Sequence, residues 1–245
     1  MLTAGREQVS CRTWTHRLNW GSVTRPSGPP VPCLIYHFTS VENLPAILAA
    51  GGLRCKASAQ PLHDVSDARI QERRARRQVE AGPGGTLHDY VPFYFTPRSP
   101  MLHRIAKQDW AEGTEVQPNL VYLVGSVERA LELGLPYAFT DGHAEMRVDV
   151  HHYDDPTDLR RLDWAVIRAP GWNGDEARRK RQAEFLVHQF APLDLLLGFA
   201  TQNENALHRV RAALREAEIG LRGKVRADWY YEPSFRQRQN GGGER

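Results

Sequence analysis

Apolar residues recur along this chain in short runs bounded by turn residues, a pattern typical of β-strands that pack in a core. The clearest run is NLVYLVG at 119–125. Runs at 34–39 and 90–96 also predict strands, and Pro92 favours an edge or a bulge for the second because proline lacks the N–H that a ladder needs. Further strands are expected over 138–140, 164–168 and 184–190.

Helical segments are expected mainly early and late in the chain. A helix over 41–50 has Ser40 as a plausible N-cap and ends at Gly51 and Gly52. Other helices are predicted over 67–79, 126–133 and 202–217. Because strands and helices do not alternate regularly, the fold class is α+β.

Residues 1–33 differ from the rest of the chain. Isolated tryptophans stand among Ser and Thr, and a Pro- and Gly-rich stretch closes the segment without any helical or strand period. We interpret it as an N-terminal extension or linker, followed by one domain over 34–235.

Composition excludes several classes of protein. A hydrophobic content of 41% and a charged content of 25% in 245 residues fit a globular protein. No apolar run approaches the roughly 20 residues of a membrane span, and no secretory signal is visible, so we expect no membrane association and a cytoplasmic location. Cys11, Cys33 and Cys55 lack CxxC spacing, and His151 and His152 would face opposite sides of a strand, so no metal site is expected.

One candidate site lies at the end of the first predicted strand. His37 and Thr39 point to the same face because strand side chains alternate, and Asn43 follows one helical turn later. The three side chains could line a cleft together. A partly buried histidine satisfied by a neighbour is the simpler alternative.

The second candidate is an arginine cluster in the helix predicted over 67–79. Arg69, Arg73 and either Arg76 or Arg77 share one helical face, whereas Arg74 stacks over Ile70 on another. The net charge of +3 does not by itself indicate a nucleic-acid partner. The cluster therefore fits a solvent-exposed basic helix, a cofactor pyrophosphate or a DNA backbone.

Two further residues could carry chemistry. Glu184 stands between the basic run 178–181 and the apolar strand that follows, where a carboxylate could bind a sugar hydroxyl or stabilise positive charge at an anomeric carbon; a local ion pair is the alternative. His143 follows the turn residues Asp141 and Gly142 and could face a cleft. Neither a Walker A loop nor a GxGxxG fingerprint is present.

Taken in order, these segments resemble the DarT family of DNA ADP-ribosyltransferases, the toxins of DarT/DarG toxin–antitoxin systems. The similarity runs from about residue 34 to Tyr231. It is carried by residues 35–39 with 43, 44 and 47, and by residues 70–79, 84–87, 89–95, 97–102, 139–143 and 181–187, among which YVPFYF, TDGHA and RQAEFLV are the most specific.

The resemblance implies an ADP-ribosyltransferase-like fold with split, curved sheets around a cleft that holds NAD as co-substrate. It implies that Glu184 is the catalytic glutamate and that Arg74 contacts NAD phosphate or assists at the acceptor base, with Arg73 and Arg76 as alternatives. The remaining residues implied to bind the cofactor are His37, Thr39, Asn43, Tyr94 and His143.

The implied reaction is transfer of ADP-ribose to thymine in single-stranded DNA, with release of nicotinamide and with Glu184, helped by Arg74, as the base. The loop over 172–181 would recognise DNA through Arg178, Arg179, Arg181 and Trp172, and a DarG-like macrodomain antitoxin would be the partner. Two alternatives stay open at this point: an ADP-ribosyltransferase acting on RNA or protein, and a non-catalytic nucleic-acid-binding module.

Overall fold

The computed structural model of the chain describes residues 28–146 and 148–233. The predicted extension over 1–33 lies mostly outside the described residues, as does the predicted domain end at 235. Within the described part, the backbone N–H of Cys33 donates to the Glu128 carboxylate, so contact with the fold begins before residue 34.

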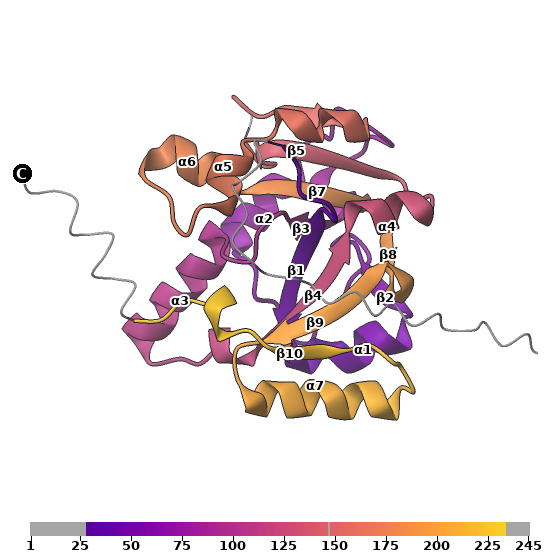
Figure 1. Cartoon of the computed structure of the whole chain (residues 1–245), viewed down its shortest axis with the longest axis vertical. Helices are drawn as coiled ribbons and strands as arrows, with labels where there is room; N and C mark the ends of the chain where they lie inside the picture. Colours follow the sequence, from indigo (N-terminus) through magenta and orange to yellow (C-terminus); the bar gives the residue numbers. More distant parts are fainter. Residues whose placement is uncertain (1–27, 147, 234–245) are drawn as a thin grey trace, which may run out of the picture.

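Ten strands form two sheets over the described residues (Figure 1). The strands are β1 (Leu34–Ser40), β2 (Gly52–Arg54), β3 (Tyr90–Tyr94), β4 (Leu120–Ser126), β5 (Tyr137–His143), β6 (His152–Tyr153), β7 (Ala183–His188), β8 (Phe190–Pro192), β9 (Leu196–Thr201) and β10 (Gly223–Val225). The large sheet has the order β10-β9-β4-β1-β3-β7-β5-β6, and β2 pairs with β8. The pairing is antiparallel except between β9 and β10.

The strand predicted at 119–125 is confirmed as β4, an interior strand of the large sheet all of whose residues are buried. Strands predicted over 34–39, 90–96, 138–140 and 184–190 are likewise confirmed as β1, β3, part of β5, and β7 with β8. These strands are readable because each buries an apolar run that is too short for a helix.

The sheet has a seam between β1 and β3. β1 pairs with β4 at seven successive positions, whereas β1 and β3 pair only at Tyr36 and Tyr94. Pro92 lies on β3 beside this seam and pairs with Leu186 of β7 on its other side. The predicted edge position for Pro92 is therefore wrong: β3 is an interior strand, and Pro92 is tolerated because the β1 ladder stops there.

Seven α-helices flank the sheet within the described residues. They are α1 (Leu44–Ala49), α2 (Ala68–Arg74), α3 (Pro100–Glu112), α4 (Val127–Glu132), α5 (Trp164–Arg168), α6 (Gly174–Lys180) and α7 (Glu204–Glu216). Short 3-10 turns occur at Val41–Asn43, Leu87–Asp89, Gln117–Asn119, Pro156–Arg161, Leu193–Leu195 and Ala227–Trp229. Figure 1 shows α2, α3, α5 and α6 on one side of the sheet and α7 running beside α1 and β10.

The predicted N-cap of the first helical segment is confirmed, because the Ser40 hydroxyl accepts from the N–H of Glu42. The strand predicted over 164–168 is wrong. That run is α5, in which the Asp163 side chain caps the N–H of Val166 and the buried Trp164 and Ile167 lie three residues apart on one helical face. In the described part of the chain, no helix is long and apolar enough to cross a membrane.

Candidate active site

Arg74 and Glu184 form a buried ion pair. The Arg74 Nη1 donates to Glu184 Oε1 at 3.0 Å and Nη2 donates to Oε2 at 2.9 Å. Glu184 is 0% exposed and Arg74 is 6% exposed. This parallel, two-bond geometry is the strongest way for a guanidinium to hold a carboxylate, so it fixes both side chains.

The backbone brings the pair together from distant parts of the chain. Asp67 caps α2 by accepting from the N–H groups of Arg69 and Ile70, which sets the helical phase that turns Arg74 inward. The outward-facing Arg73 and Arg76 keep side chains 57% and 75% exposed. Arg74 is thus the arginine of the cluster that reaches Glu184.

Glu184 sits on β7 opposite Tyr94 of β3, and its own backbone N–H donates to the Thr140 hydroxyl of β5 at 3.2 Å. Burial raises the pKa of Glu184. Arg74, His143 and a hydrogen bond from the Ala144 N–H lower the pKa by more than burial raises it, so the net pKa lies below the usual range. The carboxylate is therefore ionised at neutral pH.

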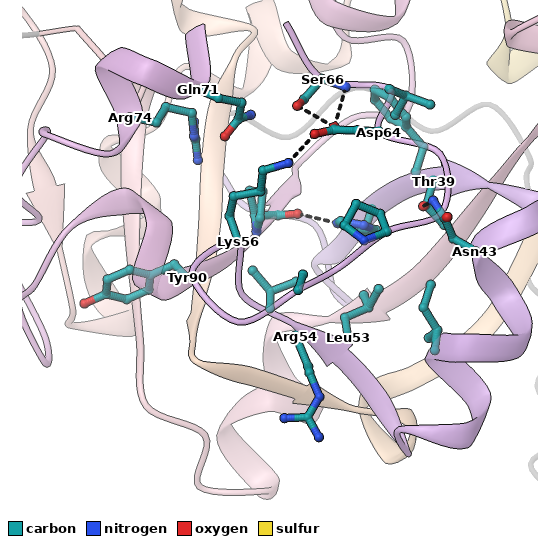
Figure 2. A pocket seen from close by; sticks show the side chains of 18 of the residues that line it. Thr39, Asn43, Leu53, Arg54, Lys56, Asp64, Ser66, Gln71, Arg74 and Tyr90 are labelled. Carbon is teal, nitrogen blue, oxygen red and sulfur yellow. Dashed lines mark hydrogen bonds and ion pairs between the residues drawn. The ribbon is translucent and has the colours of Figure 1, made fainter. Parts of the chain in front are cut away.

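A cavity of about 430 Å³ opens beside the pair. Both catalytic candidates and all the predicted cofactor residues line it: Arg74, Glu184, His37, Thr39, Asn43, Tyr94 and His143. Figure 2 shows Arg74 and Gln71 on the α2 side and Thr39 and Asn43 on the opposite side, with Lys56 between. The cavity thus unites segments that the sequence places far apart.

His37 faces the cavity at the seam between β1 and β3. Its Nδ1 donates to the carbonyl oxygen of Pro92 at 2.8 Å, a side-chain bond where the two strands lack backbone pairing. Burial lowers the pKa of His37, so the ring is neutral at physiological pH. With Nδ1 occupied as the donor, Nε2 is the nitrogen left to accept a hydrogen bond.

The side-chain amide of Asn43 makes its hydrogen bonds to other residues of the protein. Its Nδ2 donates to Thr39 Oγ1 at 3.0 Å and to the His63 carbonyl at 2.8 Å, while its Oδ1 accepts from the His63 N–H at 2.9 Å. Asn43 therefore holds the segment 56–66 against the cavity. An ion pair between Lys56 and Asp64 closes that segment on itself (Figure 2).

Sequence reasoning missed several lining residues, namely Lys56, His63, Asp64, Gln71 and Met101. Most of them stand on the irregular segment 56–66, which carries no hydrophobic period. The signal that could have located the segment is Asn43, a polar residue buried just after a strand, which requires a hydrogen-bonding partner.

The four residues predicted to contact DNA lie outside this cavity and differ among themselves. Arg178 on α6 is exposed and pairs with Asp175, and Arg179 donates to the carbonyl of Asp149. The loop predicted over 172–181 contains helix α6 over most of its length.

Arg181 is only 2% exposed, and its guanidinium donates to the carbonyl oxygens of Arg98, Val166, Ile167 and Ala169. Nε and Nη1 of Arg181 therefore donate inside the protein, and this burial disfavours the predicted DNA contact of Arg181. The half-buried Trp172 ring lies 5.8 Å from the Arg181 guanidinium carbon.

Comparisons with known proteins match most of the chain. The family model described as "ssDNA thymidine ADP-ribosyltransferase, DarT" matches residues 36–231. A DNA ADP-ribosyl transferase of Thermus sp. (strain 2.9) is 39% identical over 209 residues, which cover 82% of this chain and 98% of that protein.

Solved structures are similar over the same region. The structure of Thermus sp. 2.9 DarT in complex with ADP-ribosylated ssDNA matches with a TM-score of 0.78 and 38% identity over 83% of this chain and 99% of that chain. The structure of the same protein in complex with NAD+ matches with a TM-score of 0.73 and 36% identity over 83% and 100% of the two chains.

The fold and its cavity define an NAD-dependent ADP-ribosyltransferase. The family model covers most of the chain, and the relatives align over nearly their whole length. The chain belongs to the DarT family of ssDNA thymidine ADP-ribosyltransferases, as the resemblance in its motifs implied.

Proposed function

We propose that this protein transfers ADP-ribose from NAD to thymine bases in single-stranded DNA and releases nicotinamide. The observation that carries the proposal is the buried Arg74–Glu184 pair at the cavity wall, in a chain of the DarT family. The NAD+ and ADP-ribosylated ssDNA complexes of the similar Thermus protein support both substrates.

In this proposal Glu184 stabilises the positive charge that develops at the nicotinamide-bearing ribose carbon. Its carboxylate is ionised and shielded from water, so its field acts at low dielectric. An oxygen that accepts from Arg74 keeps a further lone pair, which can accept from a ribose hydroxyl. Arg74 holds the carboxylate in place and donates to its Oε2 at 2.9 Å.

The residues of β1 and β3 fit the nicotinamide end of NAD. NAD supplies the ADP-ribosyl group and a leaving group that departs as neutral nicotinamide. His37 Nε2 and the Thr39 hydroxyl can bond the ribose and amide region, and the Tyr94 ring, beside Glu184, can pack against the nicotinamide. Asn43 acts indirectly, because it holds the segment 56–66 that covers this part of the cavity.

The outer surface of α6 and the loop before it are proposed to bind the DNA strand. Arg178 and Arg179 would contact phosphates, and Trp172 would offer a face for base stacking. The strand must be single because the thymine ring N3 is engaged in base pairing within a duplex.

We further propose that this protein is a cytoplasmic toxin and that its partner is a DarG-like macrodomain antitoxin. The support is membership of the DarT family. Expression of the chain in a host should arrest growth, and co-expression of a macrodomain hydrolase should restore it. Toxicity that the macrodomain leaves unchanged would contradict the pairing.

The reaction can be tested with purified protein, NAD and single-stranded oligonucleotides that contain or lack thymine, followed by mass spectrometry. An ADP-ribose adduct on thymine-containing strands that disappears in Glu184→Ala is expected. Adducts on RNA or protein alone would overturn the substrate, and DNA binding with NAD left intact would favour the binding-module alternative.

A further inference from the structure

Transfer to a thymine ring nitrogen leaves a proton to be removed, because N3 carries a hydrogen before it bonds to ribose. Glu184 is poorly suited to accept it. Both carboxylate oxygens already accept from Arg74, one also accepts from the Ala144 N–H at 3.2 Å, and these contacts stabilise the ionised form. Arg74 is a cation without a lone pair to offer. The pair that organises the site therefore does not supply its base.

His143 lies next to this pair. It is the last residue of β5, it faces Ala183 in register on β7, and the following residue, Ala144, donates its N–H to Glu184. The imidazole lines the same cavity as Arg74 and Glu184, with a side chain only 12% exposed.

Glu145 places a carboxylate beside the His143 ring. Its carboxylate is anchored by the Nε of Arg73, and its second oxygen lies 3.7 Å from His143 Nδ1. A carboxylate on the Nδ1 side favours the tautomer that carries its hydrogen there. Nε2, on the opposite edge of the ring, then keeps a lone pair.

The charged groups facing His143 are Glu184 and Glu145, which raise its pKa, and Arg74 and Arg73, which lower it. Burial is the largest influence, and the net pKa lies below the usual value of 6.5. The ring is therefore neutral at physiological pH, the state in which histidine can accept a proton.

We propose that His143 is the general base that removes the N3 proton of thymine, and that Glu145, held by Arg73, is its positioning residue. The inference rests on the proposed function. The N3–H bond breaks and its proton passes to Nε2 of His143. The N3 electron pair forms the new bond to the ribose carbon, nicotinamide leaves with the electrons of the old bond, and solvent later takes the proton from His143.

His37 also lines the cavity, yet it fits this role less well. It lies on β1 across the seam, and its titration is governed by burial and by the Pro92 carbonyl rather than by Arg74 or Glu184. Of these two histidines, His143 is the one whose pKa responds to both Arg74 and Glu184.

The test uses His143→Gln and two oligonucleotides that differ at one base, thymine or 5-bromouracil. Bromine matches the methyl group in size and makes N3 more acidic, so the second base needs less help to lose its proton. We expect transfer to thymine to fall by about 10²- to 10⁴-fold with KM for NAD nearly unchanged. The loss on 5-bromouracil should be much smaller.

The pH profile is a second readout. Activity of the wild type should fall as pH drops through the pKa of His143, below 6.5, because the protonated ring cannot accept another proton. His143→Gln should lack this acidic limb. Equal losses on both bases, with the acidic limb retained, would make His143 a structural residue and overturn the proposal.

Glu145→Gln provides an independent variant because it leaves the imidazole in place. It should lower kcat on thymine and shift the acidic limb, whereas the matched exposed control Glu132→Gln should do neither. Full activity of both His143→Gln and Glu145→Gln would overturn the inference. A wild type that modifies neither base would instead contradict the proposed function itself.

Discussion

Arg74 and Glu184 stand 110 residues apart in the chain and meet through two parallel hydrogen bonds in a buried wall of the cavity. The pair joins the end of a short helix to a central strand. Because of this geometry, both catalytic activity and folding stability depend on the same two side chains. Variants of each residue can distinguish the effect on activity from the effect on stability.

Glu184→Gln keeps the size of the side chain and removes its charge. We expect transfer to single-stranded DNA to fall by about 10²- to 10³-fold, since electrostatic stabilisation of developing charge is lost. Quantifying ADP-ribosylated oligonucleotide over time measures this. Glu80→Gln, whose side chain is 66% exposed, is the matched control and should retain wild-type activity.

Arg74→Lys keeps the positive charge but cannot make two parallel bonds to one carboxylate. We expect at least a tenfold loss of activity and a lower melting temperature, because one Glu184 oxygen loses its partner in a buried site. The same change at the exposed Arg76 should alter neither property. Unchanged kinetics for Arg74→Lys would show that charge alone suffices.

The ion pair also predicts how stability depends on pH. The pKa of Glu184 is lower in the folded protein than its ordinary value of 4.5, so the folded state is stabilised above that value. This contribution is lost as pH falls below 4.5 through the folded pKa. Urea unfolding at a series of pH values should show a steeper acid loss in the wild type than in Glu184→Gln.

Arg181 is predicted to support the fold rather than bind DNA. Replacing it with alanine removes a guanidinium from four buried or half-buried carbonyl groups, and we expect a loss of about 2 kcal/mol or more in the free energy of unfolding. Denaturant titration measures this loss. The exposed Arg178→Ala should change stability by no more than about 0.5 kcal/mol.

Arg178→Ala should instead weaken DNA binding. Removing one phosphate contact is expected to reduce the salt dependence of single-strand affinity by about 0.7 in a log–log plot, equally for all base sequences. Fluorescence anisotropy without NAD, in the weakly active Glu184→Gln background, separates binding from turnover. An unaltered slope would remove α6 from the DNA interface.

Much of this arrangement is readable from sequence because local signals agree. β1 and β4 are short buried runs, and Arg74 stands four residues after Ile70 on the inner face of a helix capped by Asp67. The unpredicted helix α3 carries equally clear signals: Ser99 caps it, Pro100 starts it, and Gly113 ends it with a φ of +69°.

Other features could not be predicted because they depend on tertiary contacts. The five-residue run of α5 is apolar enough to form a strand. The Asp163 cap and the burial of Trp164 are the features that favour a helix here. Arg181 lies in a basic run that suggests a solvent-facing surface, yet the surrounding carbonyl groups draw it inside. The bridge from Asn43 to His63 likewise has no local pattern.

The single residue pair that joins β1 to β3 has a further consequence. His37 and Thr39 belong to the half of the sheet built on β4, and Glu184 belongs to the half built on β7. A ligand that contacts both halves of the sheet links them at the place where β1 and β3 share few backbone hydrogen bonds. Occupancy of the cavity should therefore slow amide exchange in β1 and β3 more than in β4, and the enzyme should be hardest to unfold when it is saturated with its own substrate.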